Sequence, residues 1–181
     1  MLFDRWRARR ANRLLIDQIH GEIVAAARSP ALYGDDGVAD TLDGRFEMVV
    51  LAAALATRRL AALGPAASDM AQELVDRVFL GFEDALREMA IGDIGVARRL
   101  KAMAGDFAGR CRAYSAALDC GDAAALGAAL ARNVFGAPAA TPAAEALARR
   151  AIAAATALDE IGYDDFASGR FRFPRFAGDA R

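Results

Sequence analysis

The sequence predicts an all-α protein, a single-domain bundle of about six helices followed by an irregular C-terminal tail. Alanine, the strongest helix former, is abundant, whereas runs of the β-branched and aromatic residues that favour strands are scarce. Apolar residues recur at intervals of three and four along most of the chain. The 181 residues suffice for one domain with a sizeable core that needs neither a disulfide nor a metal ion.

The first two helices are defined by their end signals. We expect the first over residues 3–28, because Ser29-Pro30 stops it. Its core face carries three aliphatic residues at helical spacing, namely Leu15, Ile19 and Ile23. The second is expected over residues 41–63, before Gly64-Pro65, with acidic residues at its start and arginines at its end, which suits the helix dipole.

The third and fourth helices show apolar stripes. We expect the third over residues 68–91, with a stripe formed by Leu74, Val78, Phe82, Ala85 and Met89. Gly92 ends it, and Asp93 is expected to cap the fourth helix. The fourth has the most regular pattern of the chain, in which residues recur at intervals of four and three: Val96, Leu100, Met103, Phe107, Cys111, Tyr114 and Leu118.

Two further helices and a tail complete the chain. The fifth helix follows Gly121-Asp122 and ends near Phe135, and the sixth covers residues 142–158. Residues 163–181 show no helical period, but phenylalanine and arginine alternate over 170–176, so we expect this segment to pack one face on the body. The resulting division is an N-terminal basic and aromatic helix (1–28), a helical domain (30–160) and a C-terminal tail (161–181).

Charge, cysteine content and hydropathy exclude several classes of protein. The net charge of −1 gives no general attraction to nucleic acid, and we expect no DNA partner. Cys111 and Cys120 cannot form a secreted disulfide framework and lack the spacing of metal ligands, which indicates a reducing compartment. The longest uncharged apolar run, residues 48–57, is about half the length of a membrane-spanning helix. We expect a bacterial cytoplasmic protein.

The chain offers little for catalysis, and we expect no enzyme activity, cofactor or metal. His20 is the single histidine, whereas nucleophilic catalysis needs a base beside the nucleophile. A cluster of acids (Asp35, Asp36, Asp40 and Asp43) could hold Mg²⁺ for a carboxylate-dependent enzyme, but caps at a helix start explain the same residues. An alternative function is a helical module that binds a hydrophobic small molecule, such as a quinone or haem, in a pocket lined by Phe82, Met89, Met103 and Phe107.

The back of the fourth helix is a candidate partner-binding surface. Opposite its apolar stripe, one face combines cations with two glycines: Arg98, Lys101, Gly105, Gly109 and Arg112. Glycine inside a helix costs about 1 kcal/mol relative to alanine, which suggests that a partner approaches closely. A solvated face is the alternative. The third helix carries the opposite charge on its outer face, at Asp69, Glu73, Asp76 and Glu83, and separate charged faces are typical of partner-binding proteins.

The N-terminus combines basic and aromatic residues that fall off the core face of the first helix. They are Leu2, Phe3, Trp6, Arg9, Arg10 and Arg13. This composition favours contact with an anionic membrane surface, and it would also suit ribosomal RNA. A solvated, frayed terminus is the third interpretation.

Three stretches of the sequence resemble the ubiquinol–cytochrome c chaperone family. The first is Asp40-Thr41-Leu42-Asp43-Gly44-Arg45-Phe46-Glu47, followed by Arg58-Arg59-Leu60. The second comprises Leu86-Arg87-Glu88-Met89, Gly92-Asp93-Ile94, Lys101, Met103, Gly109-Arg110 and Tyr114. The third is Ala129-Leu130-Ala131-Arg132-Asn133-Val134-Phe135. The sequence departs from the family pattern at Ala52, Ala97 and Ala108, where many relatives have a histidine, a proline and an aromatic residue.

The resemblance implies a non-enzymatic assembly factor of the cytochrome bc1 complex. Such a protein would bind newly made cytochrome b, or another bc1 subunit, at or near the inner membrane, on its cytoplasmic side in bacteria or matrix side in mitochondria. Mitochondrial members work with a second small assembly factor and associate with the ribosome. The motif positions are occupied by Asp40, Asp43, Arg45, Glu88, Asp93, Lys101, Arg110 and Tyr114. We expect all but Tyr114, which lies in the core stripe, to bind a partner.

Overall fold

The fold of the described residues is all-α, as the sequence predicts. The computed structural model describes residues 2–34, 36–89 and 92–176, with side chains from Asn12 onward. The helices are α1 (Leu2–Ala27), η1 (a 3₁₀-helix, Pro30–Leu32), α2 (Leu42–Ala62), α3 (Pro65–Glu88), α4 (Asp93–Asp119), α5 (Ala123–Val134), α6 (Pro142–Asp159) and α7 (Tyr163–Ala167). Within these ranges the one β-type pairing is an isolated bridge between Tyr33 and Val38.

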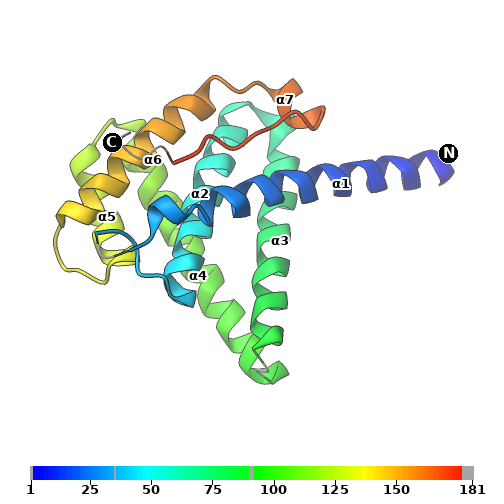
Figure 1. The fold of residues 1–181 in the computed structure, drawn as a ribbon. Helices are drawn as coiled ribbons and strands as arrows, with labels where there is room; N and C mark the ends of the chain where they lie inside the picture. The colour runs from blue at the N-terminus through cyan, green and yellow to red at the C-terminus, as the bar shows by residue number, and fades with distance from the viewer. Residues whose placement is uncertain (1, 35, 90–91, 177–181) are drawn as a thin grey trace.

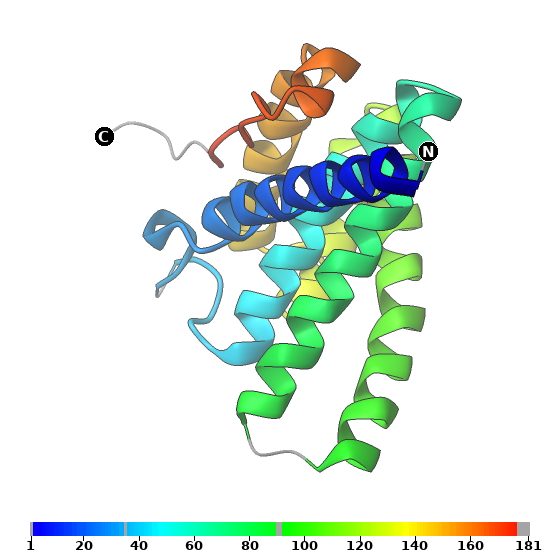
Figure 2. The same ribbon diagram turned by 90° about the vertical axis from the view of Figure 1, so that its right-hand side faces the viewer.

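Helix α2 occupies the centre of the bundle. It packs against α1, α3, α4, α5 and α6, and every residue from Val50 to Ala56 is buried. Helices α3 and α4 run side by side as a long hairpin that projects beyond the start of α2, while α1 crosses over α2 and α3 (Figures 1 and 2). Helices α5 and α6 pack against each other on the other side of α2 (Figure 1).

The boundaries of the α3–α4 hairpin differ from those expected. Helix α3 begins at Pro65 instead of residue 68, because Gly64 adopts a φ of 92° and proline is well suited to the first helical position. It ends at Glu88, and the side chain of Met89 is 49% exposed, whereas Leu86 is buried in the row formed with Leu74, Val78 and Phe82. The expectation that Asp93 caps α4 is wrong, since Gly92 occupies the N-cap.

The predicted core face of α4 is confirmed. Val96, Phe107 and Tyr114 are buried, and the other members of the stripe (Leu100, Met103, Cys111 and Leu118) are half-buried. Phe107 packs edge-on against Phe79 of α3, with 5.5 Å between ring centroids. On α1, Ile19 and Ile23 are completely buried and Leu15 is half-buried, also as expected.

The tail is more ordered than its sequence pattern indicates. Residues 163–167 form the short helix α7, because the Asp165 carboxylate accepts the Gly162 N–H (3.1 Å) and caps its start. A helix of this length shows no period that could predict it. The following segment packs on the body as expected, with Phe171, Phe173 and Phe176 buried. Glu22 of α1 holds this segment by accepting the Phe173 N–H at 3.2 Å.

The length and hydropathy of each helix decide whether it could span a membrane. In the part of the chain that the structure describes, no helix is both long and apolar enough to cross a membrane.

Replacement of Phe107 tests which face of α4 is buried. Phe107→Ala should lower the free energy of unfolding by about 3–5 kcal/mol, as expected for a buried aromatic side chain. Arg98→Ala, on the exposed face of the same helix, should change it by less than about 0.5 kcal/mol. Urea denaturation measures both values, and equal effects would contradict the assigned facing.

His20 should make the fold sensitive to acid. Burial between α1 and α3, together with the nearby Arg77 guanidinium, lowers the pKa of His20 from 6.5 to about 4, against the opposing effect of Asp17. Because the unfolded chain binds this proton more readily, the stability that the neutral ring contributes is complete above pH 6.5 and lost as the pH falls toward 4. His20→Gln should therefore reduce the loss of stability over this range in urea denaturation, and an unchanged pH profile would contradict this role.

Candidate functional site

The start of α2 and the middle of α4 are joined by a buried ion pair. Arg110 donates from Nη2 to Oε1 of Glu47 at 2.7 Å, and the two side chains are 15% and 10% exposed. Arg110 also lies 3.4 Å from the Asp106 carboxylate, one turn earlier on α4. The Arg110 guanidinium, which we expected to bind a partner, is thus already engaged inside the chain.

This ion pair is incompletely satisfied. Glu47 Oε2 and Arg110 Nε are buried and accept or donate no hydrogen bond within the described structure. Burial raises the pKa of Glu47 even though Arg110 lies beside it, so the ion pair compensates only part of the cost of removing the carboxylate from water. The pair connects the first family-like stretch with the second, which explains why both residues stand in those stretches.

Of the acidic residues around the start of α2, Asp40 forms an ion pair within the chain and Asp43 is exposed. Thr41 caps the helix by accepting the Gly44 N–H at 3.1 Å, while Asp43 lies exposed in the first turn. Asp40 and Arg45 form a two-bond ion pair at 2.6 and 3.1 Å, and the Arg45 guanidinium lies over the Tyr33 ring. Asp35 lies outside the described residues, and among those described no group of three or more acidic, His or Cys side chains is placed to hold a metal ion.

A hydrogen bond between side chains joins the family-like stretch on α4 to the one on α5. Tyr114 of α4 is completely buried, and its hydroxyl accepts a hydrogen bond from the Asn133 side chain of α5 at 3.1 Å. Burial raises the pKa of Tyr114 to about 12, so the hydroxyl remains protonated at neutral pH. The position of Tyr114 in the motif is therefore explained by packing between α4 and α5.

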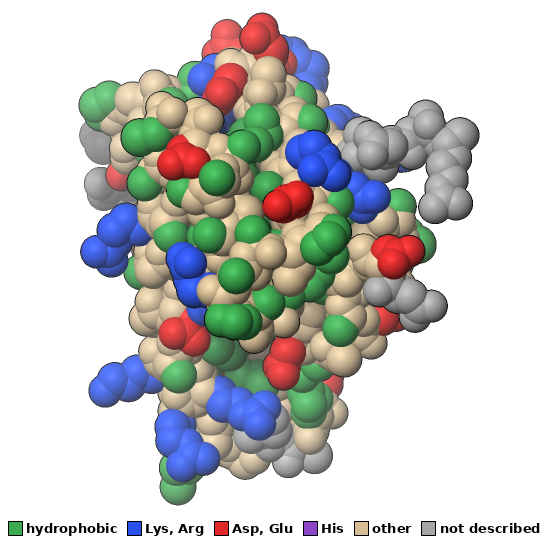
Figure 3. All heavy atoms as spheres, turned by 90° about the vertical axis from the view of Figure 1, so that its left-hand side faces the viewer, with side chains coloured by type: hydrophobic (Ala, Val, Ile, Leu, Met, Phe, Trp, Pro, Cys, Tyr) green, Lys and Arg blue, Asp and Glu red, His purple; other side chains and the backbone are tan. Residues whose placement is uncertain are grey.

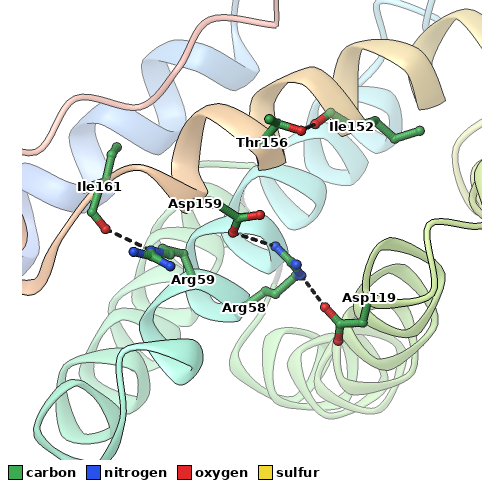
Figure 4. Close-up of polar contacts among 7 residues, drawn as sticks. All are labelled: Arg58, Arg59, Asp119, Ile152, Thr156, Asp159 and Ile161. Atoms are coloured by element: carbon green, nitrogen blue, oxygen red, sulfur yellow. Dashed lines mark hydrogen bonds and ion pairs between the residues drawn. The ribbon is translucent and has the colours of Figure 1, made fainter.

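The two arginines near the end of α2 connect three further parts of the chain (Figure 4). Arg58 donates to Asp119 at the end of α4 (2.8 Å) and to Asp159 at the end of α6 (3.0 Å). Arg59 donates to the backbone carbonyl of Ile161 at 2.8 Å. These contacts bring together helix ends far apart in sequence, so this part of the first family-like stretch serves the fold.

The tip of the α3–α4 hairpin carries the remaining acidic candidates. Asp93 lies 3.3 Å from Arg87, which also pairs with Glu83 at 2.8 Å. Glu88, the last residue of α3, is exposed. Beside them Met89 and Ile94 are 49% and 89% exposed, so the tip presents apolar side chains among charged ones.

The outer face of α4 is exposed to solvent. Arg98, Lys101 and Arg112 are exposed and form no ion pair with the described residues. At Gly105 and Gly109, no atom outside the neighbouring helix backbone lies within 4 Å of the position that a Cβ would take. Basic side chains project along the edge of the molecule that α4 forms (Figure 3). We call this surface the α4 outer face, and its members are Arg98, Lys101, Gly105, Gly109 and Arg112.

The predicted charge difference between α3 and α4 is present. On α3, Asp69, Glu73 and Asp76 are exposed and Glu83 is half-buried. Of the residues expected to contact a membrane, Arg13 is exposed on α1. The other side chains lie outside the described residues, and they are those of Leu2, Phe3, Trp6, Arg9 and Arg10.

In the part of the chain that the structure describes, the residues expected to line a quinone or haem pocket do not converge on one space. Phe82 and Phe107 are buried beside Phe79 in an aromatic cluster, whereas Met89 is exposed at the hairpin tip. The structure has a cavity of about 100 Å³ between α4, α5 and α6, and a groove of about 350 Å³ between Tyr33 and the first half of α6. None of the four residues lines either space.

Sequence reasoning missed the partners of the arginines. Asp119 and Asp159 stand outside the family-like stretches, and no local pattern connects them with Arg58. Glu47 and Asn133 stand inside those stretches, so their presence in the motif was the available signal. The sequence alone could not reveal that Glu47 pairs with Arg110, because the two residues are 63 positions apart.

Comparison with known proteins agrees with the family-like stretches. A family model described as ubiquinol–cytochrome c chaperone matches residues 35–173. The crystal structure of the Cbp3 homolog from Brucella abortus is 37% identical in sequence and superposes with a TM-score of 0.84. This similarity covers 97% of the present chain and 98% of the Brucella chain. No curated protein matches the chain.

The buried ion pair can be tested by removing one or both partners. Glu47→Ala should lower the free energy of unfolding by about 3–5 kcal/mol, because it leaves the Arg110 guanidinium buried without its main partner. The double variant Glu47→Leu/Arg110→Met should cost about 1 kcal/mol or less, since apolar side chains of similar size need no pairing. Urea denaturation of both variants measures the difference.

The exposed Asp40–Arg45 pair provides the matched control. Arg45→Ala should destabilise much less than Glu47→Ala, because solvent compensates for the lost contact. If the double variant Glu47→Leu/Arg110→Met proves as unstable as Glu47→Ala, the role assigned to the buried Glu47–Arg110 pair is contradicted.

Proposed function

This chain belongs to the ubiquinol–cytochrome c chaperone family, and on that premise we propose that it assists assembly of the cytochrome bc1 complex by holding newly made cytochrome b. Membership in a chaperone family implies a role without catalysis. The resemblance to the Cbp3 homolog extends over nearly the whole chain, which supports a common role for the complete helical bundle.

The α4 outer face is the proposed client-binding surface. The contacts of the other basic motif residues support this choice, since Arg45, Arg58 and Arg110 are each paired with carboxylates of the chain. Lys101 has no such partner among the described residues, and neither do Arg98 and Arg112 on the same face. Unpaired cations on a rigid helix are available to a partner without the breaking of an internal contact.

The two glycines of this face add to the argument. Glycine in a helix interior costs about 1 kcal/mol relative to alanine, and at Gly105 and Gly109 the fold has room for a larger residue. Packing within the chain therefore does not require these glycines. Close approach of a client segment to the helix backbone would require them.

The remaining exposed motif residues are further candidates for contact with the client. Asp43 is exposed at the start of α2, while Glu88 and Asp93 are exposed at the hairpin tip. Asp40, Arg45 and Arg110 are included as positioning residues, because their ion pairs fix the α2 start and its junction with α4. We place this activity at the cytoplasmic surface of the inner membrane in a bacterium, or at its matrix side in mitochondria. A second small assembly factor or the ribosome would be a further partner.

Charge reversal on α4 tests the proposal. The variant Arg98→Glu/Lys101→Glu/Arg112→Glu should recover roughly tenfold less cytochrome b than the wild-type chain in an affinity pull-down from solubilised native membranes, because attraction becomes repulsion across the contact. Mass spectrometry of the captured proteins provides the readout.

The control variant reverses the charge of three exposed arginines on other parts of the bundle: Arg28→Glu/Arg132→Glu/Arg149→Glu. This variant has the same net charge and should recover cytochrome b as well as the wild type. Equal recovery by both variants would move the contact away from α4. Recovery of no bc1 subunit by the wild type would contradict the proposed client.

A further inference from the structure

The tip of the α3–α4 hairpin presents exposed apolar side chains. Ile94, in the first turn of α4, is 89% exposed, and Met89, which follows the last residue of α3, is 49% exposed. The hairpin projects beyond the start of α2, so both residues lie at one extremity of the molecule (Figures 1 and 2). Neither residue lines the cavity or the groove described above. An apolar end that projects in this way can enter a fluid apolar phase.

Basic residues follow Ile94 along the same side of α4. Arg98 and Lys101 stand four and seven residues after it, which places all three within one stripe of the helix. At a rise of about 1.5 Å per residue, the two cations lie about 6 and 10 Å from Ile94 along the helix axis. Arg99 stands beside them, and the three cations are exposed and form no ion pair with the described residues. Figure 3 shows basic side chains gathered at the end of the molecule where the hairpin projects.

The carboxylates near the tip belong to the α3 side of the hairpin. Asp84 and Glu88 are exposed on α3, and Asp93 lies 3.3 Å from Arg87 of the same helix. The two edges of the hairpin therefore carry opposite charge, and the positive edge is the one that continues from Ile94. An anionic surface would attract the α4 edge and repel the α3 edge, which would orient the hairpin on that surface.

This order of apolar and basic residues matches the layers of an anionic lipid bilayer. Apolar side chains enter the boundary between headgroups and acyl chains to a depth of about 5–10 Å, while cations one to two helical turns away remain among the headgroups. Arginine and lysine also extend their charge out of an apolar layer along their alkyl stems. A stable protein partner generally buries roughly 800 Å² on each side, far more than two side chains present. The observations therefore favour lipid over a protein partner.

We propose that the tip of the α3–α4 hairpin docks on an anionic lipid bilayer. Met89 and Ile94 enter its interfacial layer, and Arg98, Arg99 and Lys101 lie at the headgroups. This contact goes beyond the proposed function, since binding to lipid requires no client. Arg98 and Lys101 also belong to the α4 outer face, so variants of Ile94 are needed to separate the two roles.

Flotation with lipid vesicles tests this docking in the full-length chain. The wild type should bind vesicles of equal parts phosphatidylglycerol and phosphatidylcholine, and should bind phosphatidylcholine vesicles roughly tenfold more weakly. Ile94→Asp should weaken binding to the anionic vesicles roughly tenfold, because an inserted aliphatic side chain becomes charged. Leu80→Asp makes the same change at an exposed leucine about two turns from the end of α3, and it should leave binding unchanged.

Three outcomes of this experiment would overturn the proposal. They are no binding of the wild type to the anionic vesicles, no weakening by Ile94→Asp, and equal weakening by Ile94→Asp and Leu80→Asp. Because Ile94 is almost fully exposed, its replacement removes no packing on which folding depends.

Insertion into the bilayer is measured with a tryptophan at the tip. Trp6 is the single tryptophan of the sequence, so Trp6→Phe/Ile94→Trp places one fluorophore at position 94. Lipids brominated in their acyl chains should quench its emission and leave that of Trp6→Phe/Leu80→Trp unchanged. Vesicle-bound protein with unquenched emission from position 94 would contradict insertion of the tip.

A pull-down in detergent separates lipid contact from client binding. Solubilised membranes contain no bilayer, so Ile94→Asp should recover as much cytochrome b as the wild type there. Loss of cytochrome b with unchanged vesicle binding would make the tip a client contact and overturn the lipid proposal. Vesicle binding that depends on Ile94 would support it even if the wild type recovered no bc1 subunit, so the two proposals fail separately.

Discussion

The middle of helix α2 is buried around its whole circumference, and five of the other helices pack against α2. From Val50 to Ala56 every residue is inaccessible, and four of these seven are alanine. Short side chains allow neighbouring helices to approach from several directions at once, whereas bulky residues would hold them apart. The alanines of this segment of α2 therefore serve packing as well as helix propensity.

Helix α4 is held against α2 at two levels. The Glu47–Arg110 pair joins them near the start of α2, and the Arg58–Asp119 pair joins them near its end. Between these contacts along α4 lies Tyr114, whose side chain is completely buried. A helix fixed in this way on its inner side offers its outer face as a rigid platform, which suits a protein that must hold a client without folding around it.

Local patterns in the sequence were sufficient for the six long helices but insufficient for the short α7 and for the polar contacts between helices. The period of α4 predicted that Phe107 is buried and Arg98 exposed, because burial follows from position around a single helix. The same period could not reveal that Arg110 is engaged, since it stands on the flank of α4 and meets Glu47 only through the packing of α2. Exposure of Met89 and the start of α3 at Pro65 were missed because helix ends depend on one or two residues.

The most direct test of the account places a photoreactive amino acid, p-benzoylphenylalanine, at the exposed Ala108 of α4, beside the α4 outer face, and, in a separate variant, at the exposed Ala153 of α6. Both positions accept a larger side chain on the surface, and both glycines of the outer face are kept. Irradiation during synthesis of the bc1 complex in native cells should crosslink cytochrome b to position 108 and leave position 153 without this product. A crosslink from position 153 alone, or from neither position, would contradict the assignment of the α4 outer face as the client-binding surface.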